Sequence, residues 1–394
     1  MNKHILDQSV QEYINQHLND DVAKIAMAKS PFITVEAKEL ANQIAAKNKS
    51  QRKLPGWYQA ANIYYPALLS IEQCSSEATA RHKATLIKGN SLIDLTGGFG
   101  VDSLYFAKNT STVTHCEINT ELSEIAAHNA IVLGQNNITF FAGNGIAMLE
   151  QSGTTFDTIY IDPARRSTAG KVFMLKDCTP NVVEHLDALL SKSNRIIIKT
   201  APLLDLSAGL KELRNVAEIH IVSVKNEVKE LLWIIEKDAG STPKVVCTTL
   251  NDQEKNFHFI KNKEELTEPN LLSGSLSTYL YEPDSALLKS GAFNLIGKTY
   301  NLQKLDSQTQ LYTASEANKL FPGRIFKINK IIKSGELKKE KQLTGNVIVR
   351  NYRDKAENLV KKYKIKPDQH RFLIFTQSKT EGYLIIDATI EQHY

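Results

Sequence analysis

The stretch Ser91-Leu-Ile-Asp-Leu-Thr-Gly-Gly-Phe-Gly-Val-Asp-Ser-Leu-Tyr-Phe-Ala107 decides the fold that we expect for this chain of 394 residues. Residues 91–95 are apolar except for Ser91 and Asp94, which predicts a buried strand with an acid at its carboxyl end. A helix is predicted from Val101 onward. The turn between them holds three glycines, which allow a sharp turn or a close approach to a ligand: Gly97, Gly98 and Gly100. This order of elements is typical of a nucleotide-like cofactor site in a doubly wound sheet.

Composition indicates an ordinary soluble protein. The length predicts two or three domains, and 23% charged with 42% hydrophobic residues is unexceptional. We expect no transmembrane helix, because no apolar run of about 20 residues exists, and no secretion signal in the polar first residues. The cysteines form no CxxC pair, so we expect no metal site or disulfide framework and a cytoplasmic setting: Cys74, Cys116, Cys178 and Cys247.

Positive charge is concentrated near the C-terminus. Between Phe321 and Lys366 there are 14 lysine or arginine residues and 4 acidic ones, a local balance of +10 in a chain of net charge +5. The group includes Lys338, Lys339 and Lys341. Such a segment predicts an appendage that binds a polyanion. The alternative is a solvated, lysine-rich surface.

The chain divides into four expected parts. Apolar residues at helical spacing predict an N-terminal helical region over residues 1–88. Strands and helices then alternate, which predicts an α/β domain with a mostly parallel sheet and a final hairpin over residues 89–240. Residues 241–322 are expected to form a small α/β domain, and residues 323–394 a compact, basic α+β domain.

Polar residues stand at the ends of four successive predicted strands. Asp94 precedes the glycine turn, and Glu117 ends the next strand about 20 residues after the first glycine. Asn144 follows the third strand, and Asp162-Pro-Ala-Arg-Arg166 ends the fourth. In a parallel sheet these carboxyl ends face one crevice, so we expect a single site there.

Each of these residue types suits part of a cofactor. A carboxylate such as that of Glu117 can accept hydrogen bonds from both hydroxyls of a ribose, and an amide such as that of Asn144 can bond an adenine amino group. The acid-proline corner puts a carboxylate beside the reacting atom. We therefore predict these cofactor-binding residues: Asp94, Thr96, Gly97, Gly98, Gly100, Glu117, Asn144 and Asp162.

The pattern of the glycine loop and the charge of Asp94 indicate which cofactor to expect. A dinucleotide loop usually has the pattern G-x-G-x-x-G, whereas this loop is Gly97-Gly98-Phe99-Gly100. Asp94 would repel a pyrophosphate, but it suits S-adenosylmethionine, which carries an ammonium and a sulfonium. The Asp162-Pro163 corner favours that cofactor further, so we predict a methyltransferase.

Two motifs, Asp94–Phe106 and Asp162–Arg166, resemble those of class I S-adenosylmethionine-dependent methyltransferases, particularly enzymes that act on RNA guanines. The whole chain resembles a bacterial family, seen in Bacteroidetes, with a ferredoxin-like insert and a THUMP-like C-terminal domain. The stretches that carry this resemblance are Leu69–Ala80, the two motifs, Asn226–Leu232, Tyr281–Ala292 and Phe321–Arg324. It implies a Rossmann-like domain at 89–240, a ferredoxin-like domain at 241–322 and an RNA-binding THUMP-like domain at 323–394. The THUMP-like domain and the basic C-terminal segment together predict a base in tRNA or rRNA as the substrate.

The fourth-strand motif departs from its relatives. Enzymes that methylate exocyclic amines usually have Asn/Asp-Pro-Pro and an aromatic residue, where this chain has Ala164 and Arg165. Arginine can stack on a base or hold a phosphate. We therefore predict these catalytic residues: Asp162, Pro163 and Arg165. We also predict these substrate-binding residues: Arg165, Arg166 and Lys199.

Several alternatives stay open. Enzymes that methylate uridine C5 have Asp-Pro-Pro-Arg and a nucleophilic cysteine, for which Cys178 is the candidate, although a buried structural thiol is the other interpretation. Gln73, Ser75 and Thr79 either face the site or belong to a helix cap at Ser75 or Ser76. Lys199 is either a substrate contact or a surface lysine. The alternative function is a non-catalytic RNA-binding module on a methyltransferase fold.

Overall fold

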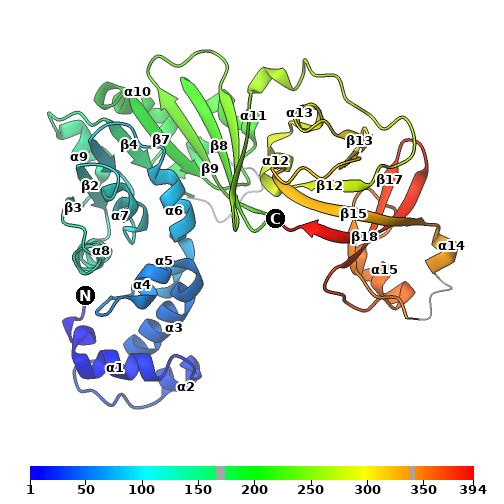
Figure 1. Cartoon of the computed structure of the whole chain (residues 1–394). Helices are drawn as coiled ribbons and strands as arrows, with labels where there is room; N and C mark the ends of the chain where they lie inside the picture. Colours follow the sequence, from blue (N-terminus) through cyan, green and yellow to red (C-terminus); the bar gives the residue numbers. More distant parts are fainter. Residues whose placement is uncertain (166–173, 338–341) are drawn as a thin grey trace. The chain divides into compact units, whose positions relative to one another are not determined.

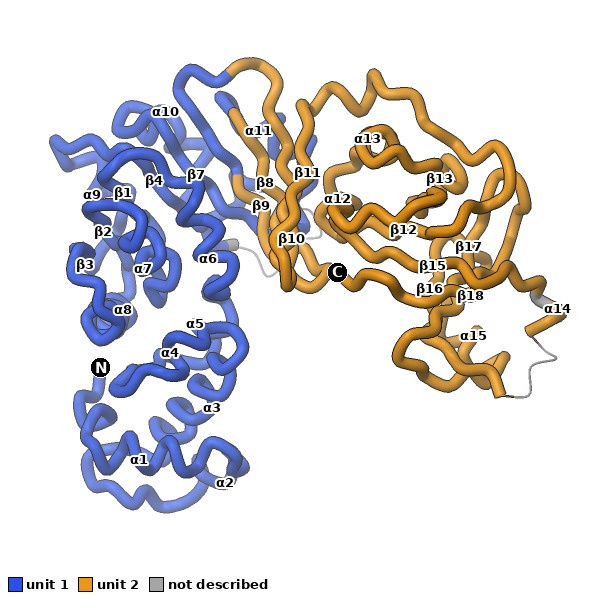
Figure 2. Tube along the Cα trace, in the orientation of Figure 1, with its two compact units in different colours: residues 1–216, 233–239 blue, residues 217–232, 240–394 orange. Residues whose placement is uncertain are grey.

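The computed structural model describes residues 1–165, 174–337 and 342–394, and the chain divides into two compact units (Figures 1 and 2). The first unit comprises residues 1–216 and 233–239, and the second comprises residues 217–232 and 240–394. The boundary therefore passes through two neighbouring strands, β8 and β9, whose bounds are given below.

The first unit begins with a group of short helices around the long helix α3. A capping box fixes the start of α3, where the backbone N–H of Glu36 donates to Glu39 Oε2 at 2.8 Å. Leu40 and Ile44 are fully buried on its inner face. The helices are η1 (Lys3–Leu6), α1 (Gln8–Gln16), α2 (Val22–Met27), α3 (Ala37–Lys53), α4 (Pro55–Gln59), α5 (Leu68–Gln73) and α6 (Glu77–Ala84). These helices lie between Lys3 and Ala84.

Five parallel strands follow in the first unit. They are β1 (Ser91–Asp94), β2 (Thr112–Glu117), β3 (Ile138–Ala142), β4 (Thr158–Ile161) and β7 (Arg195–Thr200), in the order β7-β4-β1-β2-β3. The connecting helices are α7 (Val101–Ala107), α8 (Thr120–Val132), α9 (Gly145–Gln151), α10 (Val182–Lys192) and α11 (Leu206–Glu212). Because the strand order reverses at β1, the crevice beside its carboxyl end is the switch point where α/β sheets bind ligands.

Four further strands bring this sheet to nine, in the order β11-β10-β8-β9-β7-β4-β1-β2-β3. They are β8 (Val216–Val224), β9 (Glu227–Glu236), β10 (Lys244–Leu250) and β11 (Glu254–Ile260). The turn between β8 and β9 is Lys225-Asn226, both with positive φ, as in a tight two-residue hairpin. Residues 244–260 thus extend the large sheet, whereas we expected them in the small domain. Their near-continuous burial in β10 is typical of a strand inside a sheet.

A second sheet of seven strands lies wholly within the second unit, in the order β13-β14-β12-β15-β18-β17-β16. Its strands are β12 (Tyr279–Pro283), β13 (Gln303–Asp306), β14 (Thr309–Ala314), β15 (Gly323–Ile332), β16 (Asn346–Val349), β17 (Arg371–Ser378) and β18 (Gly382–Gln392). The accompanying helices are α12 (Ser285–Ser290), α13 (Phe293–Thr299), α14 (Ser334–Leu337) and α15 (Ala356–Tyr363). One continuous sheet therefore crosses the expected boundary at residues 322 and 323.

A buried carboxylate joins the two halves of the second sheet. Glu282 on β12 lies opposite Arg324 on β15, and Arg324 Nε donates to Glu282 Oε2 at 2.7 Å. Arg350 pairs with Glu282 Oε1 at 2.6 Å, and the hydroxyl of Tyr394 donates to Oε2 at 3.1 Å. One ion-pair cluster thus connects the two motifs of the family resemblance that contain Glu282 and Arg324.

A third motif of the resemblance also has a structural role in the second unit. Asn226, in the turn between β8 and β9, accepts a hydrogen bond from the backbone N–H of Ser285 at 2.8 Å. Ser223 donates to Asp284 at 2.5 Å, and Asp284 caps the start of α12. The hairpin turn is therefore fixed to the start of α12.

We predict that Gly209→Ala destabilises the first unit. A Cβ at Gly209, in α11, would lie 2.3 Å from the Cη2 atom of Trp233, which is completely buried and donates to Thr200 Oγ1 at 3.0 Å. Overpacking of this kind costs about 1–3 kcal/mol, measurable as a lower free energy of unfolding in urea. Gly153→Ala is the control, because its Cβ would meet nothing within 4 Å. Equal losses in the two variants would contradict the prediction.

Candidate active site

A cavity of about 450 Å³ lies at the carboxyl ends of β1 to β4 in the first unit. Its wall includes seven of the eight residues predicted to bind the cofactor, which are Thr96, Gly97, Gly98, Gly100, Glu117, Asn144 and Asp162. Residues from four separate strand ends thus meet in one place, as expected for a parallel sheet.

The three glycines of the loop stand where a side chain would clash or would strain the backbone. A Cβ at Gly97 would lie 2.2 Å from the ring of His115, which is fully buried beneath the loop. Gly98 and Gly100 have φ values of +55° and +82°, which residues with side chains rarely adopt. Burial lowers the pKa of His115 to about 4, so this ring is neutral near pH 7. His115 therefore supports the loop by packing rather than by charge.

Asp94 lies beneath the loop and not on the cavity wall. It is 1% exposed, and its carboxylate accepts hydrogen bonds from Ser103 Oγ at 2.6 Å and from the backbone N–H of Thr96 at 3.1 Å. Burial raises its pKa to about 7, although both hydrogen bonds favour the ionised form. Asp94 thus acts on the cavity by holding the loop, whereas the sequence suggested direct contact with a cation.

Glu117 and Asn144 are held in place by backbone groups. Glu117 Oε2 accepts from the N–H of Gly98 at 2.9 Å, and its Oε1 accepts from the N–H of Asn119 at 2.7 Å. Asn144 caps α9 by accepting from the N–H of Ala147 at 3.2 Å. Because a carboxylate has about four acceptor sites, Glu117 can accept further hydrogen bonds from a ligand.

The corner after β4 connects the glycine loop to a buried lysine. The backbone N–H of Asp162 donates to Thr96 Oγ1 at 2.7 Å, and its carboxylate forms an ion pair with Lys199, at the end of the adjacent strand β7. The Lys199 side chain is only 14% exposed. Pro163 is buried beside this pair. Lys199 thus holds the Asp162 carboxylate and is not a surface lysine.

A short two-stranded ribbon borders the same end of the cavity. Strand β5 (Ala164–Arg165) pairs with β6 (Cys178–Thr179), and Ala164, Thr179 and Pro180 line the cavity. Arg165 is described as part of β5, whereas Arg166 lies outside the described residues. Cys178 is 2% exposed and does not line the cavity, which favours a structural thiol over a nucleophile.

In the segment before α6, some of the residues considered in the sequence analysis line the cavity and others do not. Gln73 and Cys74 line the cavity, whereas Ser75 and Thr79 are buried away from it. Ser76 caps α6 by accepting from the N–H of Thr79, as the alternative interpretation proposed. The sequence thus identified the right segment but not which of its side chains face the site.

A buried ionic network behind the cavity was not predicted. Lys83 Nζ lies 3.2 Å from Asp102 Oδ1, and Asp102 Oδ2 accepts from Ser75 at 2.8 Å and from the hydroxyl of Tyr160 at 2.9 Å. Burial by itself would raise the pKa of Asp102, but Lys83 and these hydrogen bonds outweigh it and lower the pKa. The signal in the sequence was the acid two residues after the glycine loop.

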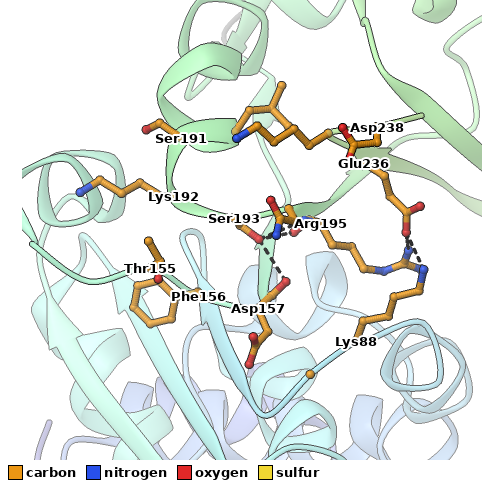
Figure 3. Close-up of a pocket in the computed structure, with 14 residues that line it drawn as sticks. Lys88, Thr155, Phe156, Asp157, Ser191, Lys192, Ser193, Arg195, Glu236 and Asp238 are labelled. Atoms are coloured by element: carbon orange, nitrogen blue, oxygen red, sulfur yellow. Dashed lines mark hydrogen bonds and ion pairs between the residues drawn. The ribbon is translucent and has the colours of Figure 1, made fainter. Parts of the chain in front are cut away.

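A larger hollow of about 560 Å³ lies at the opposite, amino end of the strands (Figure 3). Arg195 and Lys88 both contact Glu236 there, and Ser193 donates to the backbone oxygen of Asp157 at 3.1 Å. None of the predicted site residues lies there. Size alone therefore does not make it the functional site.

Two classes of site find no support in the described residues. No group of three or more histidine, cysteine or acidic side chains is placed to hold a metal ion within residues 1–165, 174–337 and 342–394. No helix in the same ranges is both long enough and apolar enough to cross a membrane.

Two family models and a solved structure match this chain. Residues 279–322 match a family model described as a ferredoxin-like domain, and residues 323–387 match one described as THUMP domain-like. The crystal structure of a provisionally assigned methyltransferase from Porphyromonas gingivalis W83 is 27% identical, covers 99% of both chains and has a TM-score of 0.86. The resemblance to class I methyltransferases with these two C-terminal domains, and the expected Rossmann-like fold, are thereby confirmed.

Curated relatives match shorter segments. An uncharacterized S-adenosylmethionine-dependent methyltransferase of Mycobacterium tuberculosis is 23% identical over 239 residues, or 61% of this chain and 63% of that protein. The chain thus spans less than two thirds of that relative. The 23S rRNA (uracil(1939)-C(5))-methyltransferase of Photobacterium profundum is 30% identical over 114 residues, which are 27% of this chain and 24% of that protein.

We predict that Asp94→Asn changes how stability depends on pH. The folded-state pKa of about 7 exceeds the ordinary value of 3.8, so the folded protein binds a proton that the unfolded chain releases. The free energy of unfolding of the wild type therefore falls as pH rises from about 4 to about 7, by up to about 1.4 kcal/mol per pH unit from this group.

Asparagine does not titrate, so the variant lacks this contribution. The difference in free energy of unfolding, variant minus wild type, is expected to rise across that window and to level off above it. Urea titrations at a series of pH values measure this difference, and the other titrating groups cancel in it. A difference that does not change with pH would contradict the pKa of Asp94.

Proposed function

We propose that this protein is an S-adenosylmethionine-dependent methyltransferase that methylates a base in RNA, tRNA or rRNA, and that its THUMP-like domain helps to bind that RNA. The observation that carries the proposal is the cavity in which the glycine loop, Glu117, Asn144 and Asp162 meet. Its volume of about 450 Å³ falls in the range of small-molecule sites.

The described residues fit the cofactor's chemical groups. The Glu117 carboxylate has acceptor capacity for two ribose hydroxyls, and Asn144 lies on the adjacent strand end with an amide for an adenine edge. The loop from Thr96 to Gly100 brings bare backbone to the middle of the cavity. When bound, S-adenosylmethionine supplies an electrophilic methyl group on its sulfonium.

Asp162 and Lys199 lie at the end of the cavity where the base that accepts the methyl group would bind. Their ion pair fixes the direction of the carboxylate, so that Asp162 accepts a hydrogen bond from an N–H of the target base and orients that nitrogen. Alignment of two bound reactants is worth as much as about 7–11 kcal/mol of the barrier. The residues thus contribute mainly by positioning, because the sulfonium is already activated.

The cysteines of the cavity favour a nitrogen atom over uridine C5 as the atom that accepts the methyl group. Carbon methylation would require a thiolate, and two cysteines, Cys74 and Cys116, line the cavity. Burial raises the pKa of Cys74 to about 11 and that of Cys116 to about 12, so both are protonated near pH 7. Cys178 lies outside the wall.

The C-terminal domain supports RNA as the substrate. It matches the THUMP-like model and contains exposed lysines on and after α15, which include Lys361, Lys362 and Lys364. The curated relative from Photobacterium, which methylates 23S rRNA, adds weight over 114 residues. The basic positions Lys338, Lys339 and Lys341 lie outside the described residues.

We expect Glu117→Ala to weaken cofactor binding. Hydrogen bonds to a charged group are worth about 1.5–3 kcal/mol each, so the loss of this carboxylate should raise the dissociation constant by at least about tenfold. Calorimetry with S-adenosylmethionine and S-adenosylhomocysteine measures this. Glu150→Ala, which removes a half-exposed carboxylate on α9 away from the cavity, is the control. If the wild type binds neither compound, the proposed function is wrong.

Asp162→Ala should abolish methylation. Nucleosides of tRNA and rRNA are compared by mass spectrometry in cells with and without the gene, which identifies the missing methylated base. A wild-type copy should restore that base, and the Asp162→Ala copy should not, because the acceptor nitrogen loses its orienting carboxylate. Full restoration by the variant would favour the non-catalytic RNA-binding module instead.

A further inference from the structure

We propose that one face of helix α3, formed by Lys49, Arg52 and Lys53, binds phosphates of the RNA strand that carries the target base. We call these three residues the α3 basic face. The proposal rests on the proposed function and extends it, because it gives the N-terminal helical region a direct part in substrate binding.

The three cations share one side of the helix. Their spacing of three and four residues brings them to neighbouring positions on its surface, and Arg52 and Lys53 lie in the last turn of α3. Lys49 and Arg52 are exposed, and Lys53 is half-buried. Arg52 has no ion pair with any residue that the structure describes. The face is thus available to an anion from outside.

Contacts tie this face to the cavity wall. Lys53 Nζ donates to the backbone oxygen of Glu72 at 2.6 Å, in helix α5. The next two residues, Gln73 and Cys74, line the cavity. The basic face is therefore joined to the segment that closes this side of the candidate active site.

The charges that act on Lys53 include that of Lys199. The pKa of Lys53 is lowered, first by burial, and the positive charges of Lys199 and Lys49 lower it further, while Cys74 and Glu72 act in the opposite direction. Lys199 is the partner of Asp162. The positive charges of Lys49 and Lys53 thus repel each other, whereas Asp162 compensates Lys199, and a bound phosphate would relieve the repulsion between the first two.

One acidic side chain faces the three cations. Glu72 pairs with Lys49 at 3.1 Å, and both side chains are about half exposed. Surface pairs of this kind are worth less than about 1 kcal/mol, so a phosphate can replace the carboxylate. Counting Glu72, the group keeps a balance of +2, and it therefore favours an anionic partner.

The position of the face selects RNA over an acidic peptide. A base that enters the cavity stays joined to its own phosphates, and these must lie at the cavity mouth. Unpaired RNA bases are commonly recognised when they are splayed out of the strand. A role of these cations in stabilising the helix end alone would be worth only about 0.3–1 kcal/mol and would not require a position beside the cavity.

The test uses the full chain with Lys49→Ala and Arg52→Ala combined. Lys24→Ala combined with Lys29→Ala is the matched control, since both lysines are exposed and lie on or just after α2. Binding of a fluorescent, single-stranded RNA oligonucleotide of mixed sequence is followed between about 50 and about 200 mM salt. Each phosphate contact contributes about 0.7 to the slope of log K against log salt, so the test variant should lose about 1.4 and the control nothing.

Three outcomes overturn the proposal. One is an unchanged slope in the test variant and in a second variant, Arg52→Glu. Another is an equal loss in the control pair. The third is equal competition by poly-glutamate, which would indicate an acidic protein partner. Calorimetry with S-adenosylmethionine on the same variants separates this result from the proposed function, because cofactor binding should persist in all of them.

Discussion

The absence of space above His115 is the constraint on which the site depends. The imidazole fills the volume that a side chain at position 97 would need, so this position at the end of β1 must be a glycine. Asp94 fixes the same loop from below through Thr96, and Thr96 in turn accepts a hydrogen bond from Asp162. Three strand ends are thereby linked, and the loop and the acid-proline corner hold each other in position.

The sequence alone predicts that the site residues meet, because the topology of a parallel sheet brings the strand ends together. Parallel strands bring their carboxyl ends to one edge, so Glu117, Asn144 and Asp162 meet whatever the side-chain packing. The direction in which each side chain points could not be predicted in this way, since it depends on neighbours from distant parts of the chain. Asp94 turns inward because Ser103 lies there, and Lys83 is buried because Asp102 and Ser75 enclose its ammonium. Patterns along the chain do not contain that information.

The second unit shows that a shared motif need not be a site. The stretches around Glu282 and Arg324 carry much of the family resemblance, yet they form a buried ion-pair cluster that joins β12 to β15. Removing one partner of such a cluster leaves an uncompensated buried charge, at a cost of about 3–5 kcal/mol. The ferredoxin-like and THUMP-like segments form one sheet through the pairing of β12 with β15, and the cluster stabilises that junction, so a boundary between them divides the sequence but not the sheet.

The same energetic argument bears on whether the site is active or decayed. Asp94 and the Lys83–Asp102 pair are buried behind the cavity, and burial of charged groups costs several kcal/mol per ion unless partners compensate. An RNA-binding module would gain nothing from them, because apolar residues of similar size would pack as well. Compensating hydrogen bonds come from Ser75, Tyr160, Ser103 and Thr96. An intact network of this cost, directed at a loop that faces an open cavity, is better explained by a bound cofactor than by a scaffold.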